Sequence, residues 1–264
     1  MSSQTPAPAP GDAVLALDTA SPVVSVAVVQ GDRTLALEAV AQRQSSRILL
    51  GLVDRVLERS GMTLETLGGL VAIQGPGSFT GLRVGLATVL GLHQATRLPA
   101  TALPTLEVLA AAAGKRPDAD DSKPEVEGTV VAVVDARRGE FFSQRFAVGS
   151  DGPAWKEVRK EARKEAREES SATPHPLEEP VPLEQPRRRT GEELAQLEVK
   201  AVAGFGLTPL RQLPHWTDDM RWIEPTALAA TAGHLAASGQ NRWQPRLLTQ
   251  PLYLEAPAVS RPRS

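Results

Sequence analysis

The chain has no cysteine among its 264 residues. This excludes disulfide bonds, thiolate ligands for zinc and a cysteine nucleophile. It also fits a reducing compartment, so we expect a cytoplasmic protein. Aromatic residues make up only 4 %, so the core must be built from valine, leucine, isoleucine and alanine. The formal net charge of −2 gives no overall attraction to nucleic acid. If the protein works on RNA, partners must supply most of the phosphate contacts.

Long apolar runs are also missing. None approaches the roughly 20 residues that a membrane span needs, so we expect no membrane association. Residues 1–11 are rich in Ser, Pro and Ala, without the basic start and apolar core of a secretory signal, and are predicted to be a disordered tail. Residues 255–264 are predicted to be a second tail. The length allows two lobes, which we place at 12–114 and 128–254 with a polar, acidic connection between them.

The first half begins with three β-rich runs at 13–17, 23–29 and 34–40, separated by turn residues. This pattern predicts an antiparallel meander. A helix is predicted at 45–59, with Ser45 or Ser46 as its N-cap. Its apolar residues cover more than one stripe, which suggests a buried contact besides the one with the sheet.

Alternation between strands and helices continues up to the connection. A strand at 70–73 leads into a glycine-rich loop, and a helix is predicted at 79–95. A short strand follows at 100–103. Pro104 suits the first turn of the next helix, predicted at 104–113.

The second half repeats the strand–turn–strand pattern with strands at 129–134 and 140–148, as duplicated lobes would. Residues 151–189 combine a helical charge run with a Pro-, Glu- and Arg-rich stretch, and are predicted to be a solvated insertion. A basic RNA-binding arm is the alternative, but acidic residues offset the basic ones. Beyond Thr190, an N-cap with an acid three residues later, we expect a strand at 200–203, a helix at 225–238 and an extended segment at 251–255.

The loop from Gly75 to Gly81 follows a strand and opens a helix, a geometry that can bind an anion. It lacks the Gly-Lys-Ser/Thr of a Walker A loop, and its glycine spacing differs from the dinucleotide fingerprint. Gly77, Gly81 and Gly85 recur every four residues, and Thr88 continues the stripe. Such a bare stripe lets another backbone approach closely. We therefore favour close packing over phosphate binding.

Two aspartates, Asp18 and Asp135, end strands before turns. Together with Gly204 and Gly206 they are weak candidates for a nucleotide site with a metal ion, although each aspartate could simply cap its turn. The four histidines have no ligand spacing, and no serine lies in a nucleophile elbow. We therefore predict no catalytic residues and no metal site.

With these features in hand, the sequence resembles the TsaB family, also called YeaZ. The resemblance extends over most of the chain in order and spacing, apart from residues 1–11 and the insertion. The glycine motif is long and specific, and the other three motifs agree with it. The segments that carry it are VLALDTA at 14–20, GPGSFTGLRVG at 75–85, VDARRGE at 134–140 and PLYL at 251–254.

The resemblance implies an α/β, two-lobed fold of the actin, Hsp70 and sugar-kinase class, with mixed sheets and flanking helices. It implies a non-catalytic scaffold that binds a TsaD-like paralogue. With a TsaE-like ATPase, this pair transfers a threonylcarbamoyl group to the adenosine 3′ of the anticodon in tRNAs that read codons beginning with A. The chain would contact tRNA through the complex and need no cofactor of its own, since ATP and Mg are used by the partners.

In this family the first two helices of the first lobe form the interface with TsaD. TsaD-like proteins carry metal-binding histidines on the first of them, where this chain has Ser45, Ser46 and Arg47. Self-association of the chain without its partner is an alternative that the sequence leaves open. The main alternative is an ATPase or small-molecule kinase of the same fold, and a glycoprotein endopeptidase ranks last. The interface residues that we predict are Leu49, Val53, Val56, Gly81, Gly85 and Thr88.

Overall fold

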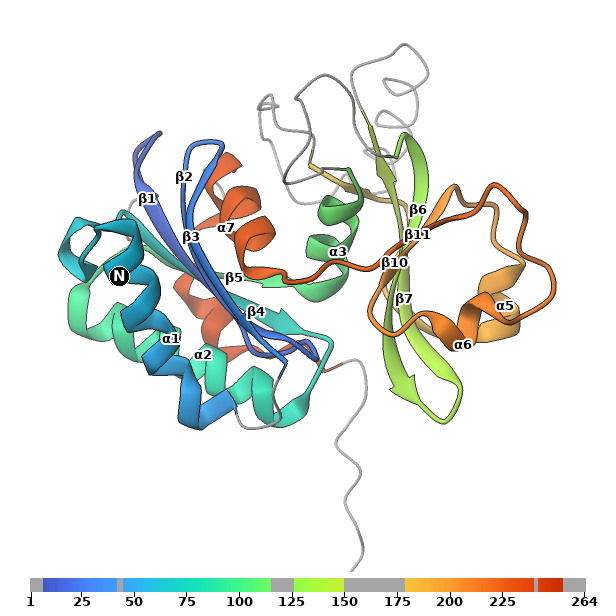
Figure 1. The fold of residues 1–264 in the computed structure, drawn as a ribbon, viewed down its shortest axis with the longest axis horizontal. Coiled ribbons are helices and arrows are strands. Elements are labelled where there is room, and N and C mark those ends of the chain that lie inside the picture. The colour runs from blue at the N-terminus through green and yellow to red at the C-terminus, as the bar shows by residue number, and fades with distance from the viewer. Residues whose placement is uncertain (1–6, 42–44, 115–125, 150–178, 240–241, 254–264) are drawn as a thin grey trace, which may run out of the picture.

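The computed structural model describes residues 7–41, 45–114, 126–149, 179–239 and 242–253. Two sheets lie side by side (Figure 1). The first has the order β3-β2-β1-β4-β5. Its strands are β1 (Ala13–Asp18), β2 (Val24–Gln30), β3 (Arg33–Val40), β4 (Gly69–Gly75) and β5 (Ala100–Pro104).

The predicted meander is confirmed, since β1, β2 and β3 pair antiparallel. Strands β4 and β5 then continue the sheet parallel to β1. All six residues of β1 are buried because helices cover both faces of the sheet. One face packs against α1 (Ser45–Ser60) and α2 (Phe79–Thr96), and the other against α3 (Thr105–Gly114) and α7 (Ala229–Ser238).

The second sheet has the order β11-β10-β6-β7-β8, with β9 also paired to β7. The hairpin of β6 and β7 is antiparallel, whereas β10 is parallel to β6 and β11 to β10. The outer face packs on two short helices, α5 (Gly191–Ala195) and α6 (Thr208–Arg211). The strands are β6 (Gly128–Arg137), β7 (Glu140–Val148), β8 (Val181–Pro182), β9 (Arg187–Thr190), β10 (Ala201–Gly204) and β11 (Arg221–Ile223).

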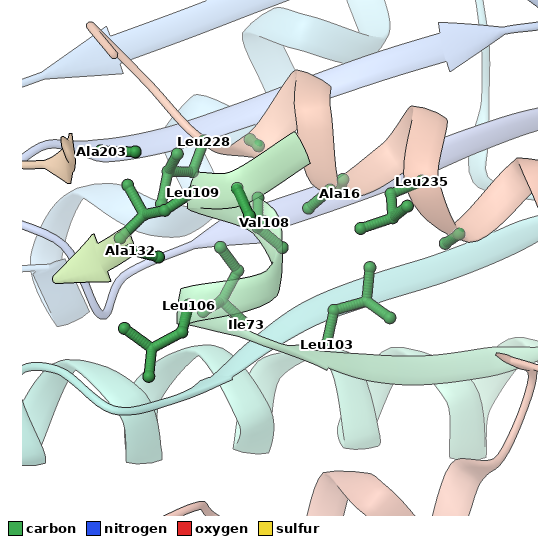
Figure 2. Close-up of a cluster of buried hydrophobic side chains, with 14 of the residues drawn as sticks. Ala16, Ile73, Leu103, Leu106, Val108, Leu109, Ala132, Ala203, Leu228 and Leu235 are labelled. Carbon is green, nitrogen blue, oxygen red and sulfur yellow. The ribbon is translucent and has the colours of Figure 1, made fainter. Parts of the chain in front are cut away.

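A single hydrophobic core fills the space between the sheets (Figure 2). Leu106 and Leu109 of α3 lie in it with Ala16 and Ile73 of the first sheet and Ala132 of the second. Helix α3 therefore joins the lobes through apolar packing and is not only a covering layer of the first.

Several expectations need correction. Pro104 closes β5, and the helix that we began there starts at Thr105. Helix α7 begins at Ala229, four residues later than predicted. It packs on the first sheet, as does the 3-10 helix η3 (Pro245–Thr249), although we assigned 128–254 to the second lobe.

The predicted insertion also ends earlier than expected. Strand β8 and residues 187–189 of β9 lie within 151–189 and pair with β7. Glu184 offsets the charge of the buried Arg189 with two hydrogen bonds of 2.8 Å. The charge run, residues 1–6 and residues 254–264 lie outside the described residues. Residues 7–11 are described, and Pro8 is buried, so the predicted disordered tail is wrong for this part. The capping box of Thr190 and Glu193 is confirmed. A short 3-10 helix, η1 (Leu64–Thr66), precedes β4.

Candidate functional site

The glycine stripe of α2 packs against the turn that follows β1. A Cβ on Gly81 would overlap the carbonyl oxygen of Thr19, and one on Gly85 would overlap the Thr19 hydroxyl. Thr19 Oγ1 also donates a hydrogen bond of 2.6 Å to the Gly81 carbonyl. A Cβ on Gly77 would lie 2.6 Å from the carbonyl oxygen of Ala20. The prediction of close packing is confirmed, but the backbone that approaches belongs to the same chain.

Two of the amide groups that could bind an anion at the start of α2 make hydrogen bonds within the chain. Ser78 caps the helix, because its hydroxyl accepts a hydrogen bond from Gly81 N at 3.3 Å. The amide of Ser78 itself donates to the Ala20 carbonyl at 2.8 Å. These bonds connect the loop to the turn after β1 and leave fewer amide donors for an anion.

Asp18 lies at the end of β1 and is completely buried. Its Oδ1 accepts hydrogen bonds from the amides of Ala20 at 2.8 Å and Ser21 at 3.2 Å. Burial raises the pKa of the carboxyl to about 6, against hydrogen bonds that lower it. Asp18 therefore shapes the turn that fits beneath α2.

Asp135 has a different environment. It is exposed on β6, and its Oδ1 accepts a hydrogen bond of 2.6 Å from the amide of Arg137. This is the turn-capping role that the sequence left open. The structure shows no contact between Asp135 and Asp18, and within the described ranges no group of three or more His, Asp or Glu side chains could hold a metal ion.

The two candidate glycines of the second lobe also have structural roles. A Cβ on Gly204 would lie 2.6 Å from the carbonyl oxygen of Val133, so this position keeps β10 close to β6. Gly206 has a φ of 63°, which glycine adopts without strain. Its amide donates to Glu224 Oε2 at 3.1 Å. The Gly206 amide is therefore already bonded to a carboxylate of the same chain.

Three of the predicted interface residues belong to the core. Leu49, Val53 and Val56 are at most 3 % exposed and pack between α1 and the first sheet. The outer side of α1 instead carries Leu50, which is 61 % exposed. Adjacent to it, Gly51 is also exposed. The apolar residues of α1 thus comprise a buried set that packs on the sheet and one exposed leucine, and the three predicted residues belong to the buried set.

Helix α2 carries two stripes of residues that are offset by two positions: an inner stripe, which packs against the turn after β1, and an outer stripe, which is exposed. Gly81 and Gly85 are buried against Thr19, and Thr88 is half-buried with its hydroxyl bonded to Val84 O at 2.8 Å. The outer stripe also recurs every four residues, a signal that sequence reasoning missed. It consists of exposed Phe79, Arg83, Ala87, Gly91 and Ala95.

At the start of this outer stripe, Arg83 lies over the Phe79 ring, with Cζ 3.9 Å from the centroid. Its Nε donates to the Tyr253 hydroxyl at 3.2 Å. The segment 251–253 is held against the glycine loop by a hydrogen bond of 2.7 Å from Leu252 N to Gln74 O. Two motifs that are far apart in sequence thus meet on one surface.

Comparison with known proteins gives a consistent result. Residues 38–165 match the sequence profile of TsaD, described as tRNA N6-adenosine threonylcarbamoyltransferase. The chain is 35 % identical over 151 residues to "tRNA threonylcarbamoyladenosine biosynthesis protein TsaB" of Haemophilus influenzae, covering 55 % of this chain and 61 % of the relative. The protein of the same name from Escherichia coli is 31 % identical over 139 residues, covering 53 % of this chain and 57 % of the relative. The matches thus span about three fifths of the length of these relatives.

Two solved structures share the fold. An uncharacterized protein with similarity to peptidase YEAZ from Pseudomonas aeruginosa has a TM-score of 0.67 and 21 % identity, over 92 % of this chain and all of the other. YeaZ from Pseudomonas aeruginosa has a TM-score of 0.59 and 21 % identity, over 85 % and 90 % of the two chains. The predicted two-lobed fold with mixed sheets and flanking helices is therefore confirmed. From its motifs and these relatives, the chain is similar in sequence to TsaB proteins over about half of its length, and it shares the fold of YeaZ.

Proposed function

We propose that this protein is a non-catalytic subunit in the formation of threonylcarbamoyladenosine in tRNA. It binds a TsaD-like protein and, with a TsaE-like ATPase, supports transfer of the threonylcarbamoyl group to the adenosine 3′ of the anticodon in tRNAs reading ANN codons. The names of the curated TsaB relatives support the process. The observation that carries the partner role is the outer face of α1 and α2.

This face has the properties of a helix-packing surface. Leu50 is 61 % exposed, a large apolar area for a surface helix position. Gly51 and Gly91 add little bulk, and a Cβ on Gly91 would lie in open space. Small residues let a partner backbone approach, and an exposed leucine beside them gains from desolvation. We therefore assign the partner contact to Leu50 and to the outer stripe of α2, in place of the buried residues expected from the sequence.

Co-purification with a TsaD-like protein tests this assignment. Leu50→Asp should remain folded, because its side chain is exposed, and should lose pairing. Leu37→Asp is the matched control, since Leu37 is the other exposed leucine of the described residues and lies on β3 at the edge of the first sheet. A tRNA modification assay should then fail with Leu50→Asp and succeed with Leu37→Asp. Normal pairing by a folded Leu50→Asp protein would disprove the assignment.

One observation favours a second candidate, nucleotide binding with ATPase or kinase activity. Among the described residues, four buried side-chain oxygens have no hydrogen-bond partner: Asp18 Oδ2, Ser21 Oγ, Gln74 Oε1 and Thr105 Oγ1. They lie near the carboxyl ends of the parallel strands β1, β4 and β5, an edge where ligands often bind in α/β sheets. Calorimetry of the isolated chain with ATP and magnesium separates the candidates. Micromolar binding with turnover would favour the enzyme.

A further inference from the structure

Arg83 is exposed on the second turn of α2, yet its guanidinium is held on two sides. One face lies over the Phe79 ring at 3.9 Å, and Nε donates to the Tyr253 hydroxyl at 3.2 Å. The Phe79 and Tyr253 rings also contact each other, with centroids 5.2 Å apart. An exposed arginine normally samples many rotamers and loses this freedom when it binds. Here its stem and Nε are oriented in advance.

Tyr253 can hold Arg83 because its own segment is fixed. Leu252 N donates to Gln74 O at 2.7 Å. A Cβ on Gly75 would lie 2.7 Å from the Leu252 carbonyl oxygen, so glycine at this position permits the close approach. The end of the described chain and the glycine loop therefore act together to position one guanidinium.

The terminal nitrogens of Arg83 are the part left available. Within the described ranges, the interactions of Arg83 are those with Phe79 and Tyr253. A guanidinium presents its nitrogens in a planar fork that matches the two oxygens of a carboxylate. We propose that Arg83 is an anchor that binds an aspartate or glutamate side chain of the partner protein, with Phe79 packing on apolar atoms beside it. This inference rests on the proposed function and deepens it.

The surroundings favour a protein carboxylate over an RNA phosphate. Binding to an RNA backbone uses several cations together, each neutralising a phosphate. Along the outer stripe, Arg83 is the one cation among Phe79, Ala87, Gly91 and Ala95. An exposed aromatic ring, here 38 % exposed, next to an arginine is instead the composition of a protein interface.

The dissociation constant of the complex with the TsaD-like protein tests the anchor. Arg83→Met keeps the apolar stem and should weaken binding by about 30-fold, as truncation of an anchor does. Arg83→Lys keeps the charge but loses the planar fork, so its affinity should lie between those of wild type and Arg83→Met. Tyr253→Phe leaves Arg83 intact and should weaken binding about fivefold, through loss of one orienting hydrogen bond. Arg33→Met is the control, because Arg33 is an exposed arginine on β3 at the far edge of the sheet.

Salt dependence gives a readout that a purely structural role would not change. Wild-type affinity should fall between 50 and 300 mM salt more steeply than that of Arg83→Met, because the variant lacks the ion pair. A folded Arg83→Met that binds within twofold of wild type would overturn the anchor alone, whereas failure of the wild-type chain to pair would overturn the proposed function as well. Loss of tRNA binding with unchanged protein pairing would overturn it in favour of phosphate recognition.

Discussion

Replacing Asp18 with asparagine should remove a pH-dependent loss of stability that the buried carboxylate imposes. Burial raises the pKa of Asp18 from 3.8 to about 6, so the folded chain holds the proton more tightly than the unfolded chain. The stabilisation is complete below the unfolded pKa and is lost as the pH rises through 6. A shift of this size corresponds to about 3 kcal/mol in all, of which about 1.4 kcal/mol is lost between pH 5 and pH 8.

Asparagine suits this test because it keeps an acceptor for the amides of Ala20 and Ser21 and carries no charge at any pH. The amide nitrogen that replaces Oδ2 lies where no partner is seen, which adds a penalty of about 1–3 kcal/mol. That penalty does not change with pH. The free energy of unfolding of Asp18→Asn minus that of wild type should therefore increase by about 1.4 kcal/mol from pH 5 to pH 8, whatever the offset.

Urea denaturation, followed by tryptophan fluorescence at several pH values, gives this difference. Subtracting wild type from the variant also removes the titration of the other carboxylates that the two proteins share. Asp135→Asn serves as the control for net charge and should stay within about 0.5 kcal/mol of wild type, because asparagine keeps an acceptor for the exposed hydrogen bond from the Arg137 amide. A difference curve for Asp18→Asn that is flat, or that falls with pH, would refute the argument that desolvation dominates at this site.

Three further predictions concern packing and can be measured by the same denaturation assay. Val53→Asp should lower the free energy of unfolding by about 3 kcal/mol or more by placing a charge in the core, so this variant tests folding and not pairing. Leu50→Asp should stay within about 0.5 kcal/mol of wild type. Equal losses of stability would disprove the assignment of the two faces of α1. Gly81→Ala should lower the free energy of unfolding by about 2–3 kcal/mol, because the new Cβ overlaps with the adjacent turn. Gly91→Ala, on the open side of the same helix, should raise it by about 0.5–1 kcal/mol. A Gly81→Ala protein as stable as wild type would contradict the packing. Arg242→Met should lower the free energy of unfolding by about 2–3 kcal/mol, because its partly buried partners Glu107 and Glu179 would lose their ion pairs. An unchanged denaturation midpoint would show that these ion pairs contribute little.

Local patterns predicted most of the secondary structure. The meander could be read from short β-rich runs between turn residues, and α5 from Thr190 followed by Glu193. The glycine loop was also interpreted correctly as a packing feature, because its spacing fits a helix stripe and no phosphate-binding motif. These features depend on neighbours within a few residues, which a single sequence displays.

The errors arose where the answer depends on residues distant in sequence. The apolar pattern of α1 cannot reveal which leucine faces the sheet, because Leu49 and Leu50 differ only by one position on the helix. Strand β9 was missed because its Arg187, Arg188 and Arg189 resemble a solvated segment until Glu184 is seen beside them. The cluster of Arg83 and Tyr253 joins residues 170 positions apart. Such contacts cannot be predicted from the neighbouring residues in the sequence.

The shared core bears on which of the two candidate functions the fold can serve. Enzymes with two lobes around a nucleotide commonly open and close the lobes during turnover. In this chain α3 packs on strands of both sheets, and α7 packs on the first sheet and against α3. Leu106, Leu109 and Leu235 therefore lie in a core that the two lobes share (Figure 2). Separating the lobes would expose this surface at about 25 cal/mol for each Å² of apolar area. A scaffold that presents α1 and α2 to a partner is stabilised by this shared core, whereas a kinase that opens its lobes would have to expose part of it in each cycle.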